Sequence, residues 1–436
     1  MSLNYVMTKD NIFVIIHLMK ILFVLECANQ PTNGTTASCL RFAKELEKKG
    51  HEVTIIGCDN IIGERYHRYY GLPKYKFPIT DSLIVKDGFL LVKVIYKTIY
   101  EAMKGKDLVH TFLPFKLHNV CRILAQQQGI AVTSAFHIVP QNVTGAMHLA
   151  GWKLLNNVML YSFKRYLYNQ VRYIHSPSQM AADLMKKHHF KNNDIRVISN
   201  GVIPFFKKMD VSRPKEYEGK FIISMAARLT DEKRQDLLIK AAAKSKYHDQ
   251  IQVLLCGQGP NENRLRKLGK KVKLANPLVI KFCSKEELRD VFNYIDLYIH
   301  ASDYEIEGIS AIEAISCGAV PLISNHPICA TKDYALDKEH CLFKHGSAKD
   351  LANKIDWFIE NKDALKDLSD KYLEYSKEFA LADQVDKLEQ MFFDAYKDKQ
   401  EGKDLPTIKP RKKDARLYKR YMRQAKKQEK HPERYN

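Results

Sequence analysis

The sequence lacks the patterns that mark disulfide-rich, zinc-binding and membrane-spanning proteins. Its nine cysteines are scattered and include no Cys-x-x-Cys pair, which argues against a disulfide framework and a zinc site. No apolar run approaches the roughly 20 residues that a membrane-spanning helix needs, and no secretory signal follows the short stretch 12–19. We therefore expect a protein of the reducing cytoplasm. Residues 1–18 are expected to form a separable N-terminal extension, because Met19 opens a strand-like segment.

Three nucleotide and metal motifs are absent as well. No segment matches Gly-x-x-x-x-Gly-Lys-Ser/Thr, and Gly257 and Gly259 lack the third glycine of a dinucleotide fingerprint. The chain has no Asp-x-Asp pair to hold a metal-bound diphosphate. Phosphate cleavage and hydride transfer are therefore disfavoured, and we expect neither a metal ion nor a resident cofactor.

The chain is long and apolar enough for two α/β domains: 436 residues, 45% of them hydrophobic. Short apolar runs alternate with amphipathic stretches, which predicts parallel sheets with crossover helices. The first series of predicted strands is 20–25, 52–57, 108–111, 131–136 and 171–174, and the second is 221–225, 252–256, 279–282, 297–300 and 320–323. Between them, residues 200–220 contain two glycines and two prolines, which favours a linker.

The charge is strongly asymmetric. The formal net charge is +20, and thirteen Lys or Arg against four Asp or Glu lie from Lys403 onward. Apolar positions recur there at helical spacing, which predicts a basic amphipathic helix that docks on an anionic membrane surface. They are Leu417, Tyr418, Tyr421, Met422 and Ala425. A disordered polar tail and a helix packed on the protein itself are the alternatives.

Two glutamates flank the start of a predicted helix that follows a strand of the second series. Glu305 lies on the loop and Glu313 about a turn and a half inside the helix. The backbone N–H groups of Gly308, Ile309 and Ser310, with the positive end of the helix dipole, form a cradle for a diphosphate. Glu305 can then read the hydroxyls of a sugar and Glu313 those of a ribose. Stabilisation of the helix dipole accounts for Glu305 but not for Glu313, which stands in an apolar run.

A second candidate site follows the strand 221–225. A lysine in the first turn of a helix opposes the helix dipole, and an anionic ligand reverses that unfavourable sign. Arg228 and Lys233 together can neutralise a departing diphosphate. The alternative is ordinary surface charge.

These residues resemble the family-4 retaining glycosyltransferases over about residues 19 to 395. The spacing from Glu305 to Glu313 matches that family's E-x7-E motif, in which the first glutamate contacts the transferred sugar and the second the ribose. Arg228 and Lys233 match its cations that hold the donor diphosphate. The resemblance implies the GT-B fold, an α/β fold of two Rossmann-like domains with parallel sheets facing across a cleft.

At the amino end, Gly34 stands sixteen residues before Gly50 and matches the second glycine of the family's glycine pair. Asn33 replaces the first glycine, and Thr35 and Thr36 can compensate by donating hydrogen bonds at the helix start.

His137 ends a predicted strand where the family places an active-site histidine, which implies a hydrogen bond to the sugar. Glu307 is a departure from many relatives, which carry Phe there, and its carboxylate can alter the choice of sugar. Gly257, Gly34, Thr35 and the residues of the diphosphate cradle complete the candidate donor-binding set.

The resemblance also assigns roles to the predicted domains. Residues 19–205 form the acceptor-side domain, 206–219 the linker and 220–381 the nucleotide-sugar-binding domain; 382–400 form a return helix onto the first domain, and 401–436 the basic tail.

We expect a retaining hexosyltransferase that uses a nucleotide sugar, with UDP favoured over GDP, and a saccharide or lipid-linked acceptor of the cell envelope. The basic, aromatic stretch 65–77 favours a membrane-linked acceptor, at the inner face of the cell membrane. The alternatives are a nucleotide-sugar epimerase, a phosphorylase on the same architecture, and a basic nucleic-acid-binding protein. The last leaves the paired glutamates unexplained, so we expect no specific nucleic acid partner.

Overall fold

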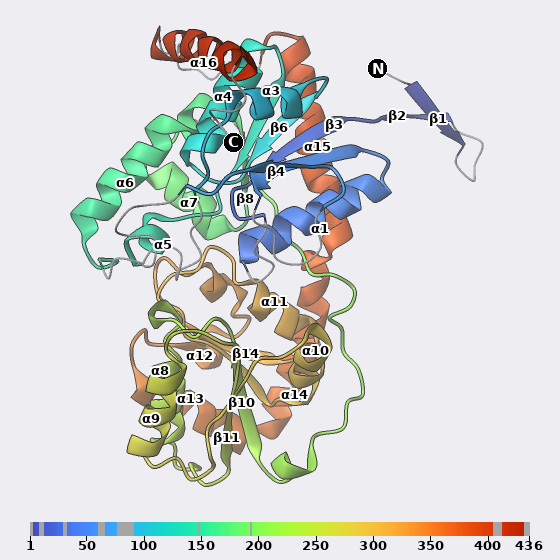
Figure 1. Cartoon of the computed structure of the whole chain (residues 1–436). Coiled ribbons are helices and arrows are strands. Elements are labelled where there is room, and N and C mark those ends of the chain that lie inside the picture. The colour runs from blue at the N-terminus through green and yellow to red at the C-terminus, as the bar shows by residue number, and fades with distance from the viewer. Residues whose placement is uncertain are drawn as a thin grey trace. The chain divides into compact units, whose positions relative to one another are not determined.

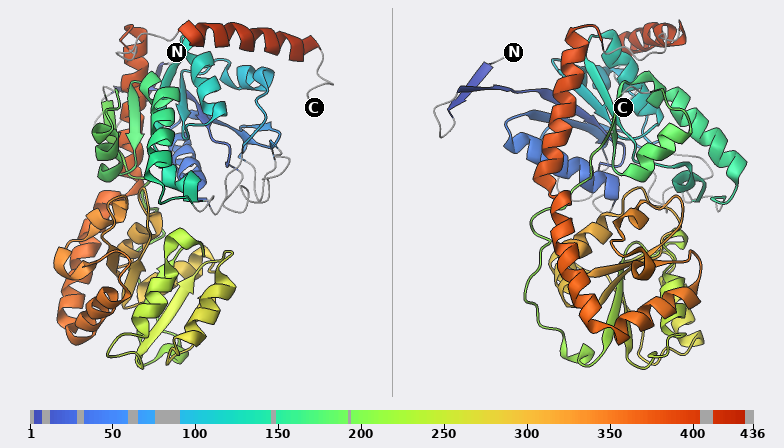
Figure 2. Two further views of the ribbon diagram at one scale, coloured as in Figure 1. Left: turned by 90° about the vertical axis from the view of Figure 1, so that its left-hand side faces the viewer. Right: turned by 180° about the vertical axis from the view of Figure 1, so that it is seen from behind.

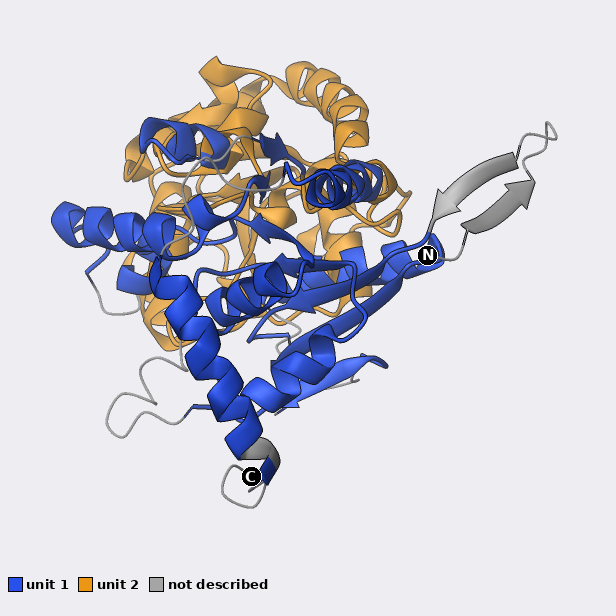
Figure 3. Ribbon diagram, turned by 90° about the horizontal axis from the view of Figure 1, so that it is seen from above, with its two compact units in different colours: residues 1–177, 181–198, 385–436 blue, residues 178–180, 199–384 orange. Residues whose placement is uncertain are grey.

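The computed structural model divides the chain into two compact units, each built on one parallel sheet (Figures 1 and 3). Unit 1 comprises residues 1–177, 181–198 and 385–436, and unit 2 comprises 178–180 and 199–384. The residues that the structure describes are 3–7, 13–28, 33–59, 66–75, 91–145, 149–191, 194–403 and 412–430.

Unit 1 contains a seven-stranded sheet of strand order β5-β4-β3-β6-β7-β8-β9, parallel throughout. The inner strands β6, β7 and β8 are buried at every position, including the polar residues His110, Thr133 and His175. The strands are β3 (Lys20–Val24), β4 (Glu52–Cys58), β5 (Tyr69–Leu72), β6 (Leu108–Thr111), β7 (Ala131–Ala135), β8 (Tyr173–Ser176) and β9 (Asp194–Val197).

The helices of unit 1 connect these strands or follow them. They are α1 (Gly34–Lys48), α3 (Tyr96–Met103), α4 (Lys116–Gln127), α5 (Pro140–Gly145), α6 (Lys153–Tyr166), α7 (Gln179–Lys187), α15 (Leu381–Gln400) and α16 (Lys412–Lys430), with α7 and α15 each having a few residues in unit 2. Strands β1 (Leu3–Met7) and β2 (Phe13–His17) form a separate antiparallel pair.

Unit 2 contains a six-stranded parallel sheet of strand order β12-β11-β10-β13-β14-β15. Its strands are β10 (Phe221–Ala226), β11 (Ile251–Cys256), β12 (Val279–Lys281), β13 (Leu297–His300), β14 (Val320–Ser324) and β15 (Leu342–Phe343). Its helices are α8 (Gln235–Ala242), α9 (Glu262–Lys271), α10 (Lys285–Tyr294), α11 (Ile309–Ser316), α12 (Lys338–Cys341), α13 (Ala348–Glu360) and α14 (Lys362–Ser376).

The predicted fold class, two α/β domains with parallel sheets, is confirmed. Every strand predicted from the sequence is present, with boundaries that differ by two residues at most. The sheet order in unit 2 brings the carboxyl ends of β10, β11 and β13 to one edge, because these strands are parallel neighbours. The loops that carry the candidate donor-binding residues of this unit start at that edge.

The chain passes between the units near residues 198 and 384. Residues 206–219, predicted as a linker, lie in unit 2, where Phe206 and Tyr217 belong to the hydrophobic core. The later part of α15 packs in unit 1, where Phe392 contacts Phe23 and Glu389 lies 2.7 Å from the imidazole of His51.

Helix α16, drawn in red in Figure 2, lies against α3 and α4 of unit 1. The guanidinium of Arg122 donates to Asp414 at 3.0 Å, and both side chains are buried. The ring of Tyr421 stacks on that of Tyr96 at 4.6 Å. The tail therefore holds a helix packed on the protein itself, one of the alternatives that the sequence left open. Among the described residues, no helix combines the length and apolarity needed to cross a bilayer.

Candidate functional site

The loop between β13 and α11 requires a glycine at its end. Gly308 has a φ of 82°, in the left-handed region, and caps α11. A Cβ at this position would lie 2.3 Å from Cγ2 of Thr331 and 3.3 Å from Cε1 of His300. The helix therefore starts directly at the packed end of the sheet, and its first N–H groups have no intrahelical partner.

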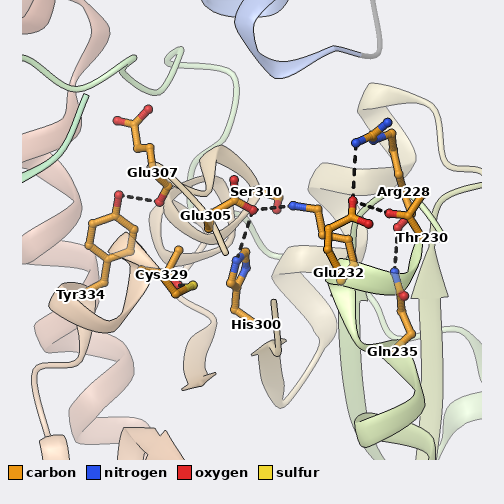
Figure 4. A network of polar contacts seen from close by, with 12 residues as sticks. Arg228, Thr230, Glu232, Gln235, His300, Glu305, Glu307, Ser310, Cys329 and Tyr334 are labelled. Atoms are coloured by element: carbon orange, nitrogen blue, oxygen red, sulfur yellow. Dashed lines mark hydrogen bonds and ion pairs between the residues drawn. The ribbon is translucent and has the colours of Figure 1, made fainter. Parts of the chain in front are cut away.

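Glu305, labelled in Figure 4, forms an ion pair with Lys233 in unit 2. The ammonium of Lys233 donates to Oε2 of Glu305, and both side chains are mostly buried. Burial alone would raise the pKa of Glu305, but the charge of Lys233, with a smaller contribution from His300, holds it well below its usual range. Burial likewise opposes the charged form of Lys233, yet Glu305 and Glu232 raise its pKa. Both groups are thus ionised at neutral pH.

His300 is a site residue that the sequence reasoning missed. It ends β13, is buried, and its Nε2 lies 3.6 Å from Oε2 of Glu305. Burial lowers its pKa, although Glu305 acts in the opposite direction. The imidazole is therefore neutral at neutral pH. A polar residue at the carboxyl end of a parallel strand was the available signal, since ligands of such sheets bind beyond that edge.

The predicted helix start at Lys233 is wrong in its geometry. Residues Asp231–Lys233 form a single 3-10 turn, and α8 begins only at Gln235. Arg234 between them is left-handed, with a φ of 55°. Lys233 consequently lies on a short turn before the helix, where it reaches Glu305.

Arg228 lies on the loop after β10, with nearly half of its side chain exposed. Its Nη2 lies 3.5 Å from Oε1 of Glu232. The same oxygen accepts a hydrogen bond of 2.6 Å from the hydroxyl of Thr230 (Figure 4). The amide of Gln235 donates to the backbone carbonyl of Arg228 at 2.8 Å. The contacts with Glu232 and Gln235 thus hold the loop in place, while the guanidinium of Arg228 remains accessible to solvent.

Gly257 lies behind this loop. Its backbone lies so close to that of Ala227 that a Cβ on residue 257 would be 2.0 Å from the Ala227 carbonyl oxygen. The backbone of Ala227 donates to Cys256 at 3.1 Å, and that of Leu229 donates to Gln258 at 3.0 Å. The structure shows Gly257 shaping the Arg228 loop, and its predicted contact with the donor stays a prediction.

The residues of α11 lie beside the ion pair. Ser310 is in the first turn, and its hydroxyl is 2.8 Å from that of Tyr298, which is 3.4 Å from Nδ1 of His300. Glu313 lies one turn further in and is 6% exposed. Unit 2 therefore gathers Arg228, Lys233, Glu305, Gly308, Ile309, Ser310 and Glu313 around the carboxyl edge of its sheet.

Glu307 has a different role from the one that the sequence suggested. It is 3% exposed and accepts from the hydroxyl of Ser199 at 2.5 Å, from the backbone N–H of Asn200 at 2.8 Å and from the Asn200 side chain. Tyr334 donates to its backbone carbonyl at 2.8 Å. Its carboxylate fastens the loop to the segment where the chain enters unit 2.

In unit 1, Gly34 and Thr35 begin α1, and Asn33 caps it. The Asn33 side chain accepts from the N–H groups of Thr35, at 2.9 Å, and Thr36, at 3.3 Å. The hydroxyl of Thr36 donates to Cys27 at 2.5 Å. The Thr36 hydroxyl thus contacts the preceding loop, and the compensation predicted for Thr35 and Thr36 stays a prediction.

His137 follows β7 in unit 1. Its ring lies 5.6 Å from Phe112 and 5.3 Å from His175. Burial, with a contribution from His175, lowers its pKa well below the usual range, so the ring is neutral at neutral pH. Within the described part of the chain, its buried Nε2 has no hydrogen-bond partner. The stretch 65–77, predicted as acceptor-side, lies partly outside the described residues.

Another buried pair that the sequence reasoning missed follows β3. Glu26 accepts from Nε2 of His118 at 2.5 Å, and Nδ1 of His118 accepts from the backbone of Phe112 and Leu113. Among the described residues, no group of three or more His, Cys, Asp or Glu could hold a metal ion.

The chain matches two glycosyltransferase family models. Residues 207–378 match glycosyl transferases group 1, and residues 32–204 match glycosyltransferase family 4. The α-monoglucosyldiacylglycerol synthase of Streptococcus pneumoniae is 22% identical over 308 residues, which are 68% of this chain and 68% of that protein. The GDP-mannose-dependent α-mannosyltransferase of Mycolicibacterium smegmatis is 23% identical over 320 residues, 70% of this chain and 79% of that protein.

Solved structures show the same fold. The Anabaena protein HepE in complex with UDP and glucose has a TM-score of 0.67 at 17% identity, over 86% of this chain and 100% of that one. Fold and sequence together define a glycosyltransferase with the GT-B fold. Within that class, the chain belongs to glycosyltransferase family 4.

Proposed function

We propose that this glycosyltransferase moves a hexosyl group from a nucleotide-diphosphate sugar to a glycolipid or polysaccharide acceptor, with retention of the anomeric configuration. The observation that carries the proposal is the buried ion pair of Lys233 and Glu305 beside the start of α11. Such a pair holds an ammonium and a carboxylate beside the N-terminus of α11, and a helix N-terminus favours the binding of anions such as a diphosphate.

Binding of the donor exchanges the partners of this pair. The diphosphate takes up the ammonium of Lys233 together with the first N–H groups of α11, and Arg228 adds a second cation. Glu305 is then released to accept hydrogen bonds from the sugar hydroxyls. Glu313, one turn into the helix, accepts from the ribose.

The reaction breaks the bond between C1 of the sugar and the diphosphate oxygen. A new bond forms between C1 and the oxygen of the acceptor hydroxyl, and the hydroxyl proton passes to an oxygen of the departing diphosphate. Fixed cations that meet developing charge in a dry site are worth about 10²- to 10³-fold in rate for each group removed. In this chain Lys233 and Arg228 supply that charge.

We also propose a role for His137. Because the pKa of its imidazole is held low, it acts as a neutral hydrogen-bond partner for a sugar hydroxyl and not as a base. Its Nε2, which no described residue engages, is the atom proposed to make that bond.

Relatives differ in the nucleotide of the donor. HepE was solved with UDP, whereas the Mycolicibacterium smegmatis relative is named for GDP-mannose. We propose a UDP-sugar for this chain, and the name of the Streptococcus pneumoniae relative supports a glycolipid product.

A donor screen tests the proposal. Purified protein is incubated with UDP- and GDP-linked hexoses, with and without a lipid extract, and nucleotide release and sugar products are measured. The expected result is nucleotide release that depends on one donor and on an acceptor fraction. A donor converted into its epimer without release of nucleotide would instead show an epimerase, and binding of no donor would overturn the proposal.

A further inference from the structure

Helix α6 of unit 1 is apolar on two opposite faces. One face packs inward through Leu160 and Phe163, which are buried next to the hydrogen-bonded Asn156. Residues three and four apart share a helix face, so the outward face carries Leu154, Val158 and Tyr161, exposed by 66, 55 and 56%. Trp152, directly before the helix, is 55% exposed. Exposed apolar groups gathered in this way, here called the α6 stripe, mark an interaction site.

Helix α16 of the same unit packs its apolar side against α3 and α4. Tyr421 is 6% exposed, and Leu417, Tyr418, Met422 and Ala425 are partly buried. Its exposed side is cationic, because the exposed residues that the structure describes on it are Ala415 and the cations Lys412, Lys413, Arg416, Lys419, Arg420, Arg423, Lys426, Lys427 and Lys430. The buried acid Asp414 is directed at Arg122. This set of nine cations is the α16 cationic face.

Both features belong to unit 1. Tyr166 is the last residue of α6, and the phenols of Tyr96 and Tyr166, after burial, raise the pKa of Tyr421 to about 12. Both helices can be followed in Figures 1 and 2. Tyr166 is thus within electrostatic range of Tyr421, and the α6 stripe lies on the turns of α6 that precede Tyr166.

We infer that the α6 stripe and the α16 cationic face form one docking surface for the headgroup region of an anionic lipid bilayer. Trp and Tyr prefer this region because their rings are apolar and their polar edges remain hydrated. Basic residues near an anionic leaflet are drawn to it electrostatically. The stripe enters the bilayer and the cationic face lies on it. A nucleic acid would satisfy the cations but not the stripe, and a second copy of this chain would cover the stripe but be repelled by the cations.

This assignment differs from the amphipathic tail expected from the sequence. The apolar positions of α16 are used in packing against the protein, so the apolar part of the contact comes from α6 instead. The inference extends the proposed function by naming the surface from which a lipid acceptor is taken.

The test is cosedimentation of the full chain with vesicles of phosphatidylcholine, with and without phosphatidylglycerol. We expect binding to the anionic vesicles that weakens as salt rises. Lys419→Glu, Arg423→Glu and Lys426→Glu together should lower the partition coefficient at least about a hundredfold, from about fivefold per cation lost. The matched control reverses three exposed cations of α9 in unit 2, Lys267→Glu, Lys270→Glu and Lys271→Glu, and should bind nearly as the parent chain does.

The stripe is tested separately by Leu154→Ser, Val158→Ser and Tyr161→Ser. Because these side chains are exposed, the variant should fold, yet bind anionic vesicles at least about tenfold more weakly, since each apolar side chain buried in the bilayer contributes. Phe282→Ser with Leu336→Ser, exposed residues of unit 2, is the control.

Trp152 reports insertion directly, because the chain has two tryptophans and Trp357 is packed on His340. In a Trp357→Phe variant, vesicles should shift the emission of Trp152 to the blue. Unchanged emission, or equal binding by the charge-reversed, stripe and control variants, would overturn the inference. So would a stripe that only mediates self-association in light scattering, or cations that bind only nucleic acid. The vesicle assays contain no sugar donor, so they measure membrane binding independently of glycosyl transfer. Failure of this inference can therefore be told apart from failure of the proposed function.

Discussion

The carboxylate of Glu307 accepts a hydrogen bond of 2.5 Å from the hydroxyl of Ser199, the residue at which the chain enters unit 2. Glu307 is two residues after Glu305 and directly before Gly308. The contact therefore ties the proposed sugar-binding loop to the entry segment of the unit.

Glu307→Ala should lower the free energy of unfolding by about 1 to 3 kcal/mol, because it leaves buried donors of Ser199 and Asn200 unpaired. It should also raise the KM for the donor, since the loop that carries Glu305 loses its anchor. Thermal unfolding and steady-state kinetics measure the two effects. Glu339→Ala, whose side chain is 80% exposed, is the control. Unchanged stability and KM would show that the contact holds nothing in place.

Lys233→Met should slow transfer by about 10²- to 10³-fold, because a fixed cation at the leaving group is lost. It should also change the pH dependence. In the parent chain Lys233 holds the pKa of Glu305 low, so the ion pair contributes to stability above the unfolded pKa of about 4.3 and is lost as pH falls.

Without Lys233, burial raises the pKa of Glu305, and the acidic limb of the pH profile of kcat/KM should move to higher pH. Lys240→Met removes a surface cation paired with Asp236 and should leave the profile in place. If the two variants gave the same profile, Lys233 would have no special link to Glu305.

Glu313→Ala should chiefly weaken nucleotide binding, by about tenfold or more in Kd, because a charged acceptor for ribose hydroxyls is removed. Calorimetric titration with UDP measures this in the absence of transfer. Glu262→Ala on α9, with a side chain 41% exposed, is the matched control. A Kd for UDP equal to that of the control would place the ribose elsewhere.

Chelators should leave transfer largely intact, because Arg228, Lys233 and the start of α11 are proposed to supply the charge that a divalent cation supplies elsewhere. Activity before and after EDTA, and after return of magnesium or manganese, is the measurement. Loss with EDTA and recovery with either metal would contradict this reading of the diphosphate site.

Strands β3, β10 and β11 could be predicted from the sequence because burial on both faces makes them mostly apolar. Three edge strands, β5, β9 and β15, were not predicted. β5 lies in a basic aromatic stretch, β9 contains Asp194 and Arg196, and β15 has two residues, so local sequence gave little signal.

The site was predictable where chemistry follows spacing along the chain. Glu305, Gly308 and Glu313 belong to one strand, loop and helix, and their places follow from local structure. The contacts of Glu307 with Ser199 and of Asp414 with Arg122 join segments that are distant in the sequence, and no local pattern specifies them. For that reason the sequence pattern suggested a contact of Glu307 with the sugar and a contact of the apolar side of α16 with the membrane.

The anomeric configuration of the product tests the central claim most directly. The protein is given an α-linked UDP-hexose and a glycolipid acceptor, UDP release is followed, and the new linkage is assigned by the proton coupling of its anomeric centre in NMR. Our proposal predicts one UDP for each transferred sugar and an α-linked product. A β-linked product, or UDP released with free sugar as the sole product, would contradict it.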